Sequence, residues 1–222
     1  MVLCTPRYNP ASVESTVTGL YPLKTAGVVG VIVLLALTHL RPHHPFSRIG
    51  PANYVTAVRA ALVSLVAGLV GEPSTPTLAA AAVAASALAD ALDGLDGWLA
   101  RRTHLASAFG ARFDMEIDAL LILMLSVLAW QHGKAGAWVL ASGLLRYGFV
   151  AAGGIWSWLR RPLAPTVRAR AVCVAQILGL MLALLPAITP PASARIAAMS
   201  LAALAYSFAV DILWLWRHRS DH

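Results

Sequence analysis

The sequence predicts an all-α integral membrane protein, because three of its properties are those of multi-span helical chains. Of the 222 residues, 59% are hydrophobic and only 12% are charged. The mean hydropathy is +0.70. The apolar residues gather in long runs, and basic residues cluster in the short segments between them. The net charge of +7 therefore indicates membrane topology and contact with anionic lipid rather than with nucleic acid.

The first of two predicted units is the N-terminal region, residues 1–52. Residues 20–40 are apolar and reach spanning length, so we predict an extra membrane helix there. A cleavable signal peptide is not expected, because the run starts late and no small-x-small site follows it. Residues 41–52 are basic and interrupted by Pro, which is typical of a segment at the level of the lipid headgroups.

The second unit, residues 53–222, is predicted to contain six helices. The expected helices cover residues 53–70, 77–99, 111–130, 135–159, 171–188 and 194–216. Pro, Gly or clustered basic residues mark the boundaries between them. Two boundaries are expected to be basic loops, one at Arg101-Arg102 and one from Arg160 to Arg170. The second helix is rich in Ala, which permits close helix packing in lipid.

Four aspartates stand on either side of the loop between the second and third of these helices. Asp93 and Asp96 are three residues apart and Asp114 and Asp118 are four apart, so each pair shares one helix face. On adjacent antiparallel helices the two pairs would surround one small volume. Carboxylates placed so closely repel one another unless cations neutralise them. No Cys or His stands at a matching spacing, so the oxygen ligands indicate Mg²⁺ or Mn²⁺.

The same stretch reads D-x2-D-G-x2-A-R-x8-G-x3-D-x3-D. The fixed positions are Asp93, Asp96, Gly97, Ala100, Arg101, Gly110, Asp114 and Asp118. This pattern resembles the signature of the CDP-alcohol phosphotransferase (CDP-alcohol phosphatidyltransferase) family and matches it at every fixed position. An acidic loop with regularly spaced Asp is the alternative, and fixed gaps without insertion disfavour it.

Upstream, Asn53-x2-Thr56-x2-Arg59 resembles the element that precedes the signature in that family. The three positions recur every three residues, so they lie roughly on one side of a helix. The alternative is a capped helix whose polar first turn sits in the interface. We favour a role facing the substrate.

The resemblance implies a six-transmembrane-helix core, a homodimer, and an enzyme that transfers a phosphatidyl group from CDP-diacylglycerol to a polar alcohol with release of CMP. It implies two Mg²⁺ or Mn²⁺ ions held by Asp93, Asp96 and Asp114. Asp118 would be a further ligand or the catalytic base on the acceptor hydroxyl. The candidates for contact with the CDP donor are Asn53, Thr56, Gly97, Ala100, Arg101 and Gly110.

Two departures qualify the resemblance. Asp90 creates a second D-x2-D-G register that lacks the following Ala-Arg, so we keep Asp93 as the first ligand. Asp90 itself is either a supporting carboxylate or simply paired. Between the last two aspartates the chain reads D-M-E-I-D-A, whereas members that use glycerol phosphate commonly read D-P-x-A-D-K. This difference weakens glycerol phosphate as the acceptor without naming another.

Three arginines are candidates for contact with the acceptor or a phosphate: Arg112, Arg146 and Arg168. Arg146 and Asp211 are ionisable residues inside predicted apolar spans, where a charge is costly unless it is paired. Arg146 is predicted to lie buried near the middle of its span. It would contact a phosphate or pair with Glu116 or Asp211.

Charge asymmetry orients the predicted spans. Counting Lys and Arg on alternate sides gives twelve on the side of the aspartates and four on the other, namely Arg7, Lys24, Lys134 and Arg195. By the positive-inside rule the aspartates face the cytoplasm.

Three other functions compete with phosphatidyl transfer from CDP-diacylglycerol. A soluble CDP-alcohol would instead donate to diacylglycerol, with the same metal chemistry. A divalent-cation or proton transporter predicts carboxylates spread over the membrane depth, whereas these cluster at one end. A catalytically inactive member that acts as a lipid-binding or assembly subunit would not require four adjacent aspartates.

Overall fold

The computed structural model describes residues 17–43, 51–103, 108–161, 163 and 166–219, with side chains described for 17–34, 55–94, 110, 113–161, 163 and 166–219. Within these residues every regular element is a helix, which confirms the predicted all-α class. The elements are α1 (Tyr21–His43), α2 (Pro51–Gly68), α3 (Pro76–Thr103), α4 (Ala108–Gln131), η2 (Ala137–Leu140), α5 (Ala141–Ile155), η3 (Ser157–Arg160), α6 (Val167–Leu184) and α7 (Ala192–Arg217).

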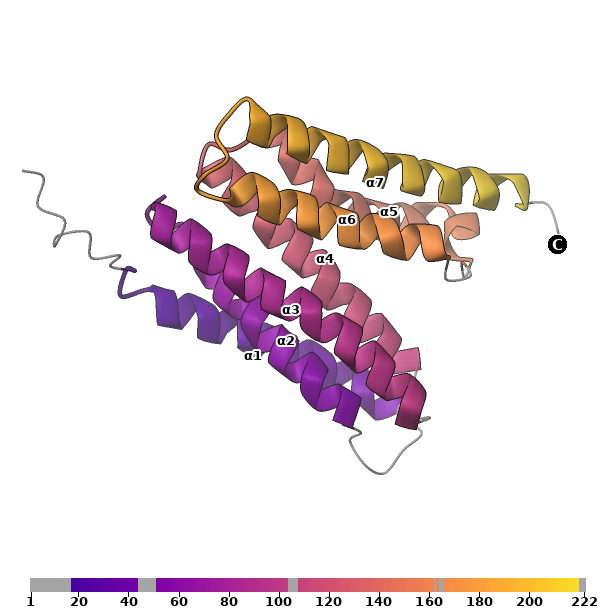
Figure 1. Ribbon diagram of the computed structural model, residues 1–222. Coiled ribbons are helices and arrows are strands. Elements are labelled where there is room, and N and C mark those ends of the chain that lie inside the picture. Colours follow the sequence, from indigo (N-terminus) through magenta and orange to yellow (C-terminus); the bar gives the residue numbers. More distant parts are fainter. Residues whose placement is uncertain (1–16, 44–50, 104–107, 162, 164–165, 220–222) are drawn as a thin grey trace, which may run out of the picture.

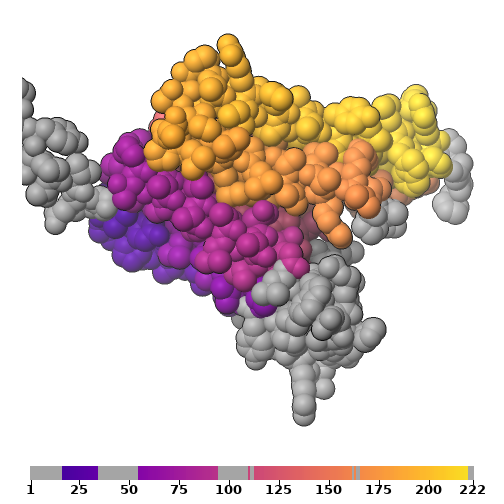
Figure 2. All heavy atoms as spheres, in the orientation of Figure 1, coloured from indigo at the N-terminus to yellow at the C-terminus, as the bar shows by residue number. Residues whose placement is uncertain are grey.

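Helix α4 lies at the centre of the bundle. Figure 1 shows α1, α2 and α3 on one side of it and α5, α6 and α7 on the other. Helix α2 packs on α3 and α6 packs on α7, while α4 contacts α2, α5 and α6. Figure 2 shows α3 beside the paired α6 and α7 on one face of the molecule. The long helices thus bring α2, α3 and α4 together at one end, where the aspartates lie.

The core follows from the apolar faces of α2, α4 and α6. Its largest fully buried apolar side chains include Val63, Val66, Leu121, Leu125, Leu128, Ile177, Leu180 and Leu184. Four described helical segments are long and apolar enough to cross a membrane: 76–94, 137–155, 167–184 and 192–217. Shorter apolar helical segments cover 21–34 and 55–68.

Several helix ends differ from the sequence-based expectation. Helix α3 continues through Arg101 and Arg102 to Thr103, where we expected a loop. No Gly or Pro interrupts this stretch, and Arg is a good helix former, so the helix has no reason to stop earlier. Helix α4 also begins earlier than expected, at Ala108. Residues 104–107, between the two helices, lie outside the described part.

The basic segment from Arg160 to Arg170 is not one continuous loop. Helix α6 begins at Val167 because the Thr166 hydroxyl caps it, accepting from the backbone N–H of Ala169 at 3.2 Å. Arg168 and Arg170 consequently lie on a helix rather than in a loop.

The predicted helix over 135–159 was also wrong in its extent, because it is divided into η2, α5 and η3. Trp156 adopts an extended backbone with φ −109° and ψ 104°, which ends α5. The adjacent Gly153-Gly154 pair has low helix propensity, and Arg160 Nε donates to the Gly153 carbonyl at 2.6 Å.

The predicted extra hydrophobic helix is confirmed as α1, which packs on α2. A Cβ added to Gly68 would lie 2.2 Å from Thr25 Oγ1, so a larger residue there would displace the Thr25 side chain of α1. The start of α1 is fastened by the buried Glu72, whose side chain is 1% exposed. Glu72 accepts from the Thr18 backbone N–H at 2.6 Å and the Thr18 hydroxyl at 2.7 Å, and it pairs with Lys24.

We expect Glu72 to make the docking of α1 sensitive to acid. The hydrogen bond from Lys24, followed by that from the Thr18 backbone, lowers the pKa of Glu72 from 4.5 to about 2. Because the folded pKa is depressed, this stabilisation is complete above pH 4.5 and is lost as pH falls toward 2. Thermal unfolding of the detergent-solubilised protein across that range should show a falling Tm. Glu72→Gln should have a lower Tm at pH 7 and a weaker pH dependence, and identical pH profiles would contradict this account.

Candidate metal and active site

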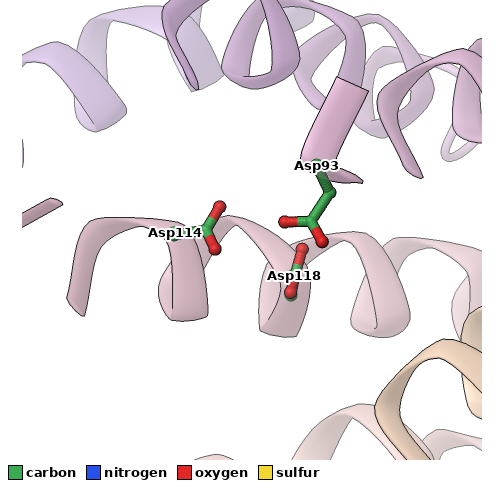
Figure 3. A group of neighbouring side chains, drawn as sticks. All are labelled: Asp93, Asp114 and Asp118. Carbon is green, nitrogen blue, oxygen red and sulfur yellow. The ribbon is translucent and has the colours of Figure 1, made fainter. Parts of the chain in front are cut away.

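Three carboxylates converge between α3 and α4. Asp93 extends from α3 toward the face of α4 that carries Asp114 and Asp118, one turn apart (Figure 3). Each residue offers a carboxylate oxygen, and the three oxygens lie within 4.8 Å of one another. The helical spacing in the sequence thus predicted correctly that Asp114 and Asp118 share a face and that Asp93 approaches them from the neighbouring helix.

The arrangement fits a hard divalent cation. Mg²⁺ and Ca²⁺ bind oxygen ligands at roughly 2.0–2.6 Å, so oxygens about 4–5 Å apart or closer can share one ion. In this group of described residues, all three ligands are carboxylates and none is Cys or His. That ligand set suits Mg²⁺ or Mn²⁺ better than Zn²⁺.

The group is open on one side and closed on the other. The side chains of Asp93, Asp114 and Asp118 are 31%, 34% and 20% exposed, respectively. Opposite them lies Arg59 of α2, whose side chain is only 1% exposed. An ion or substrate can therefore approach from the exposed side, with Asp118 the most deeply placed of the three carboxylates.

Arg59 joins all three carboxylates. Its Nη1 lies 2.9 Å from Asp93 Oδ1 and also pairs with Asp114, and its Nη2 lies 2.6 Å from Asp118 Oδ1. Its Nε donates to the Ala89 carbonyl of α3 at 3.1 Å. The sequence predicted that the N-x2-T-x2-R element, which ends at Arg59, faces the substrate, but it did not predict the contact of Arg59 with the carboxylates. The available signal was an arginine in an apolar helix, which needs a buried partner.

The other predicted donor contacts are placed only in part. Thr56 lies on α2 one turn before Arg59 and is buried, and Gly110 lies in the first turn of α4. The helices also include the backbones of the remaining candidates, whose side chains lie outside the described residues: Asn53, Asp96, Gly97, Ala100, Arg101 and Arg112. Asp90 is half-buried on α3, one turn before Asp93.

The remaining arginine candidates pair with neighbouring helices. Arg146 pairs with Glu116 of α4, which is one of the two pairings expected for it. Arg146 stands at the middle of the apolar segment 137–155, as expected, but its side chain is 28% exposed and therefore only partly buried. Arg168 donates to the Ser207 carbonyl at 2.9 Å and pairs with Asp211, which joins α6 to α7.

Comparison with known proteins identifies one family. The model of the CDP-alcohol phosphatidyltransferase family matches residues 50–211. That range runs from α2 into α7 and includes Arg59 and the three carboxylates, whereas α1 lies outside it. Searches of curated proteins and of solved structures each give no significant match. Because the family model covers well over half of the 222 residues, the chain belongs to the CDP-alcohol phosphatidyltransferase family.

Proposed function

We propose that this chain transfers a phosphatidyl group from CDP-diacylglycerol to a polar alcohol and releases CMP, using Mg²⁺ or Mn²⁺. Its family makes it a phosphatidyl-transfer enzyme, and its apolar helices fit a multi-pass membrane protein. The observation that carries the proposal is the convergence of Asp93, Asp114 and Asp118 within 4.8 Å, at the positions where the family signature has its aspartates. The homodimer implied by the resemblance is part of the same proposal.

The roles follow from charge and position. Asp93 and Asp114 would hold divalent metal, together with Asp96. When bound, such ions neutralise a pyrophosphate and the departing phosphate. Arg101 is suited to the donor phosphates, since a guanidinium offers paired hydrogen bonds. Gly97, Ala100 and Gly110 would allow the nucleotide to approach the helix backbones.

Asp118 is proposed as the base for the acceptor. The acceptor oxygen forms a bond to the phosphorus that carries diacylglycerol, and the bond from that phosphorus to the bridging oxygen of CMP breaks. The hydroxyl proton passes to the Asp118 carboxylate and then to solvent. Asp118 suits this role because it is the least exposed of the three carboxylates and stands one turn beyond Asp114 along α4.

The acceptor is proposed only as a polar alcohol. Glu116 stands between the last two aspartates, with its side chain 52% exposed and paired with Arg146. Met115 beside it is also exposed. Met115, Ile117 and Ala119 stand where the D-P-x-A-D-K pattern has Pro, Ala and Lys. This supports an acceptor other than glycerol phosphate.

The direction of transfer is tested by following the lipid. Purified protein in lipid nanodiscs receives CDP-diacylglycerol with labelled acyl chains and a panel of polar alcohols, each with Mg²⁺ or Mn²⁺. We expect CMP together with a labelled lipid that contains the alcohol. If CMP forms only from soluble CDP-alcohols and labelled diacylglycerol, the direction is wrong while the family chemistry stands. If neither donor yields CMP but vesicles show cation flux, the transporter alternative replaces the proposal.

We also propose that the carboxylates face the cytoplasm, which the excess of basic residues on their side supports. Single cysteines are placed in a background with Cys4 and Cys173 replaced by Ser. Arg219→Cys, at the exposed end after α7, should react with an impermeant thiol reagent only from the cytoplasmic side. Ala187→Cys, in the exposed α6–α7 turn, should react only from the opposite side. The reverse pattern would contradict the orientation, and labelling of both from one side would contradict the α7 span.

A further inference from the structure

Arg59 occupies the interior of the proposed metal site. Its terminal nitrogens contact all three carboxylates, at 2.9 Å from Asp93 Oδ1 and 2.6 Å from Asp118 Oδ1, with Asp114 paired to Nη1. These are the same carboxylates whose oxygens lie within 4.8 Å of one another. A cation supplied by the protein therefore stands where a bound cation would be coordinated.

The net charge of the carboxylate group depends on the Arg59 guanidinium. Among the described side chains of this group, three carboxylates and one guanidinium leave two net negative charges, which one divalent cation would balance. Without Arg59, three negative charges would face one another across a few ångströms beside a buried protein wall, where repulsion is strong. Arg59 consequently stabilises the site before any metal arrives.

The guanidinium and a bound ion compete for the same carboxylates. Oxygen ligands bind such ions at roughly 2.0–2.6 Å, so an ion among these oxygens would stand only a few ångströms from Nη1 and Nη2. Two cations at that separation repel each other. Metal binding must therefore weaken some of the ion pairs that Arg59 makes.

The anchoring of Arg59 permits this exchange without loss of its position. Its Nε donates to the Ala89 carbonyl, 3.1 Å away on α3 and one turn before Asp93. That bond holds the inner part of the side chain between α2 and α3. Only the outer end of the guanidinium has to change partners when a cation enters.

We infer that Arg59 is an internal counter-cation that lowers the metal affinity of the carboxylate group and keeps its metal-free form folded. The inference rests on the proposed metal site and adds a positioning residue to it. It states that the Arg59 guanidinium competes with the metal ion for the carboxylates. The alternative is that Arg59 orients the carboxylates so that they bind the metal.

The test measures Mn²⁺ binding and stability rather than turnover. Mn²⁺ is titrated into chelator-treated protein in detergent, with detection by electron paramagnetic resonance, and Tm is recorded in excess chelator and at saturating Mn²⁺. For Arg59→Gln we expect Mn²⁺ to bind about tenfold tighter or more, because a nearby positive charge is gone. Its Tm should fall in chelator and recover most of the loss with Mn²⁺.

Lys134→Gln is the matched control. Lys134 is also a buried cation, but it donates to the carbonyls of Leu185 and Ile188, at 2.9 and 2.6 Å, beyond the end of α6. Its replacement should lower Tm equally with and without Mn²⁺ and leave Mn²⁺ affinity unchanged. Arg59→Lys keeps the charge and should bind Mn²⁺ within about threefold of the wild type, since the electrostatic competition remains.

The outcomes distinguish a failure of the inference about Arg59 from a failure of the proposed metal site. Equal or weaker Mn²⁺ binding by Arg59→Gln overturns the inference while leaving the metal site intact. If Arg59→Gln does not fold, Arg59→Lys decides alone, and weaker Mn²⁺ binding by it would show that Arg59 orients the ligands. No Mn²⁺ binding by the wild type or by Arg59→Gln would remove the proposed metal site and the inference with it.

Discussion

Asp93→Asn and Asp114→Asn are each expected to abolish CMP formation while leaving the protein folded. Each change removes the charge of a metal ligand but keeps the shape of the side chain. The loss of turnover should exceed the roughly 10²–10⁴-fold that a general base contributes, because the ions that neutralise the pyrophosphate would be bound poorly or not at all. Turnover and Tm of the purified variants in detergent are the two measurements.

Asp90→Asn is the control for this prediction. Asp90 stands one turn before Asp93 on the same helix and would be the first ligand in the alternative register. It should change turnover far less than Asp93→Asn. If Asp93→Asn kept near-normal turnover and Asp90→Asn did not, the chosen register would be wrong.

Asp118→Asn is expected to lower turnover by roughly 10²–10⁴-fold if Asp118 acts as the general base. In that case the binding of donor and metal should change little, so the loss appears mainly in kcat. A carboxylate oxygen of Asp118 also lies within 4.8 Å of those of Asp93 and Asp114, which allows a second role, in which Asp118 binds metal with them. The two roles make different demands on added metal.

Titrating metal against the rate of Asp118→Asn distinguishes them. A lost ligand weakens metal affinity, so high Mg²⁺ or Mn²⁺ should partly restore the rate. A lost base is not replaced by metal, and the rate should stay low at every concentration. Rescue by metal would therefore remove the base assignment, and an unaffected rate would remove both roles.

The carboxylate site could be predicted because its geometry is mostly local. The spacing of Asp114 and Asp118 places them on one face wherever the helix goes, and Asp93 lies in the C-terminal half of α3, the helix that precedes α4 in the chain. Arg59 could not be placed in the same way. Its contacts depend on how α2 packs against α3 and α4, which no spacing within α2 encodes.

Helix boundaries were predicted less well for physical reasons. Basic residues indicated loops at Arg101-Arg102 and at Arg168, yet arginine is a good helix former and both segments are helical. Conversely, the apolar run 135–159 was expected to be one helix. Its interruption depends on the backbone of Trp156 and on the hydrogen bond from Arg160 to Gly153, and hydropathy does not report either.

The most direct measurement of the central claim is CMP formation from CDP-diacylglycerol and a polar alcohol, with and without divalent metal. Wild-type protein in nanodiscs should release CMP with Mg²⁺ or Mn²⁺, stop when excess chelator is added, and resume when metal is restored. Asp93→Asn, measured in parallel, should release none under any of these conditions. Undiminished CMP release by the wild type in excess chelator would contradict the account.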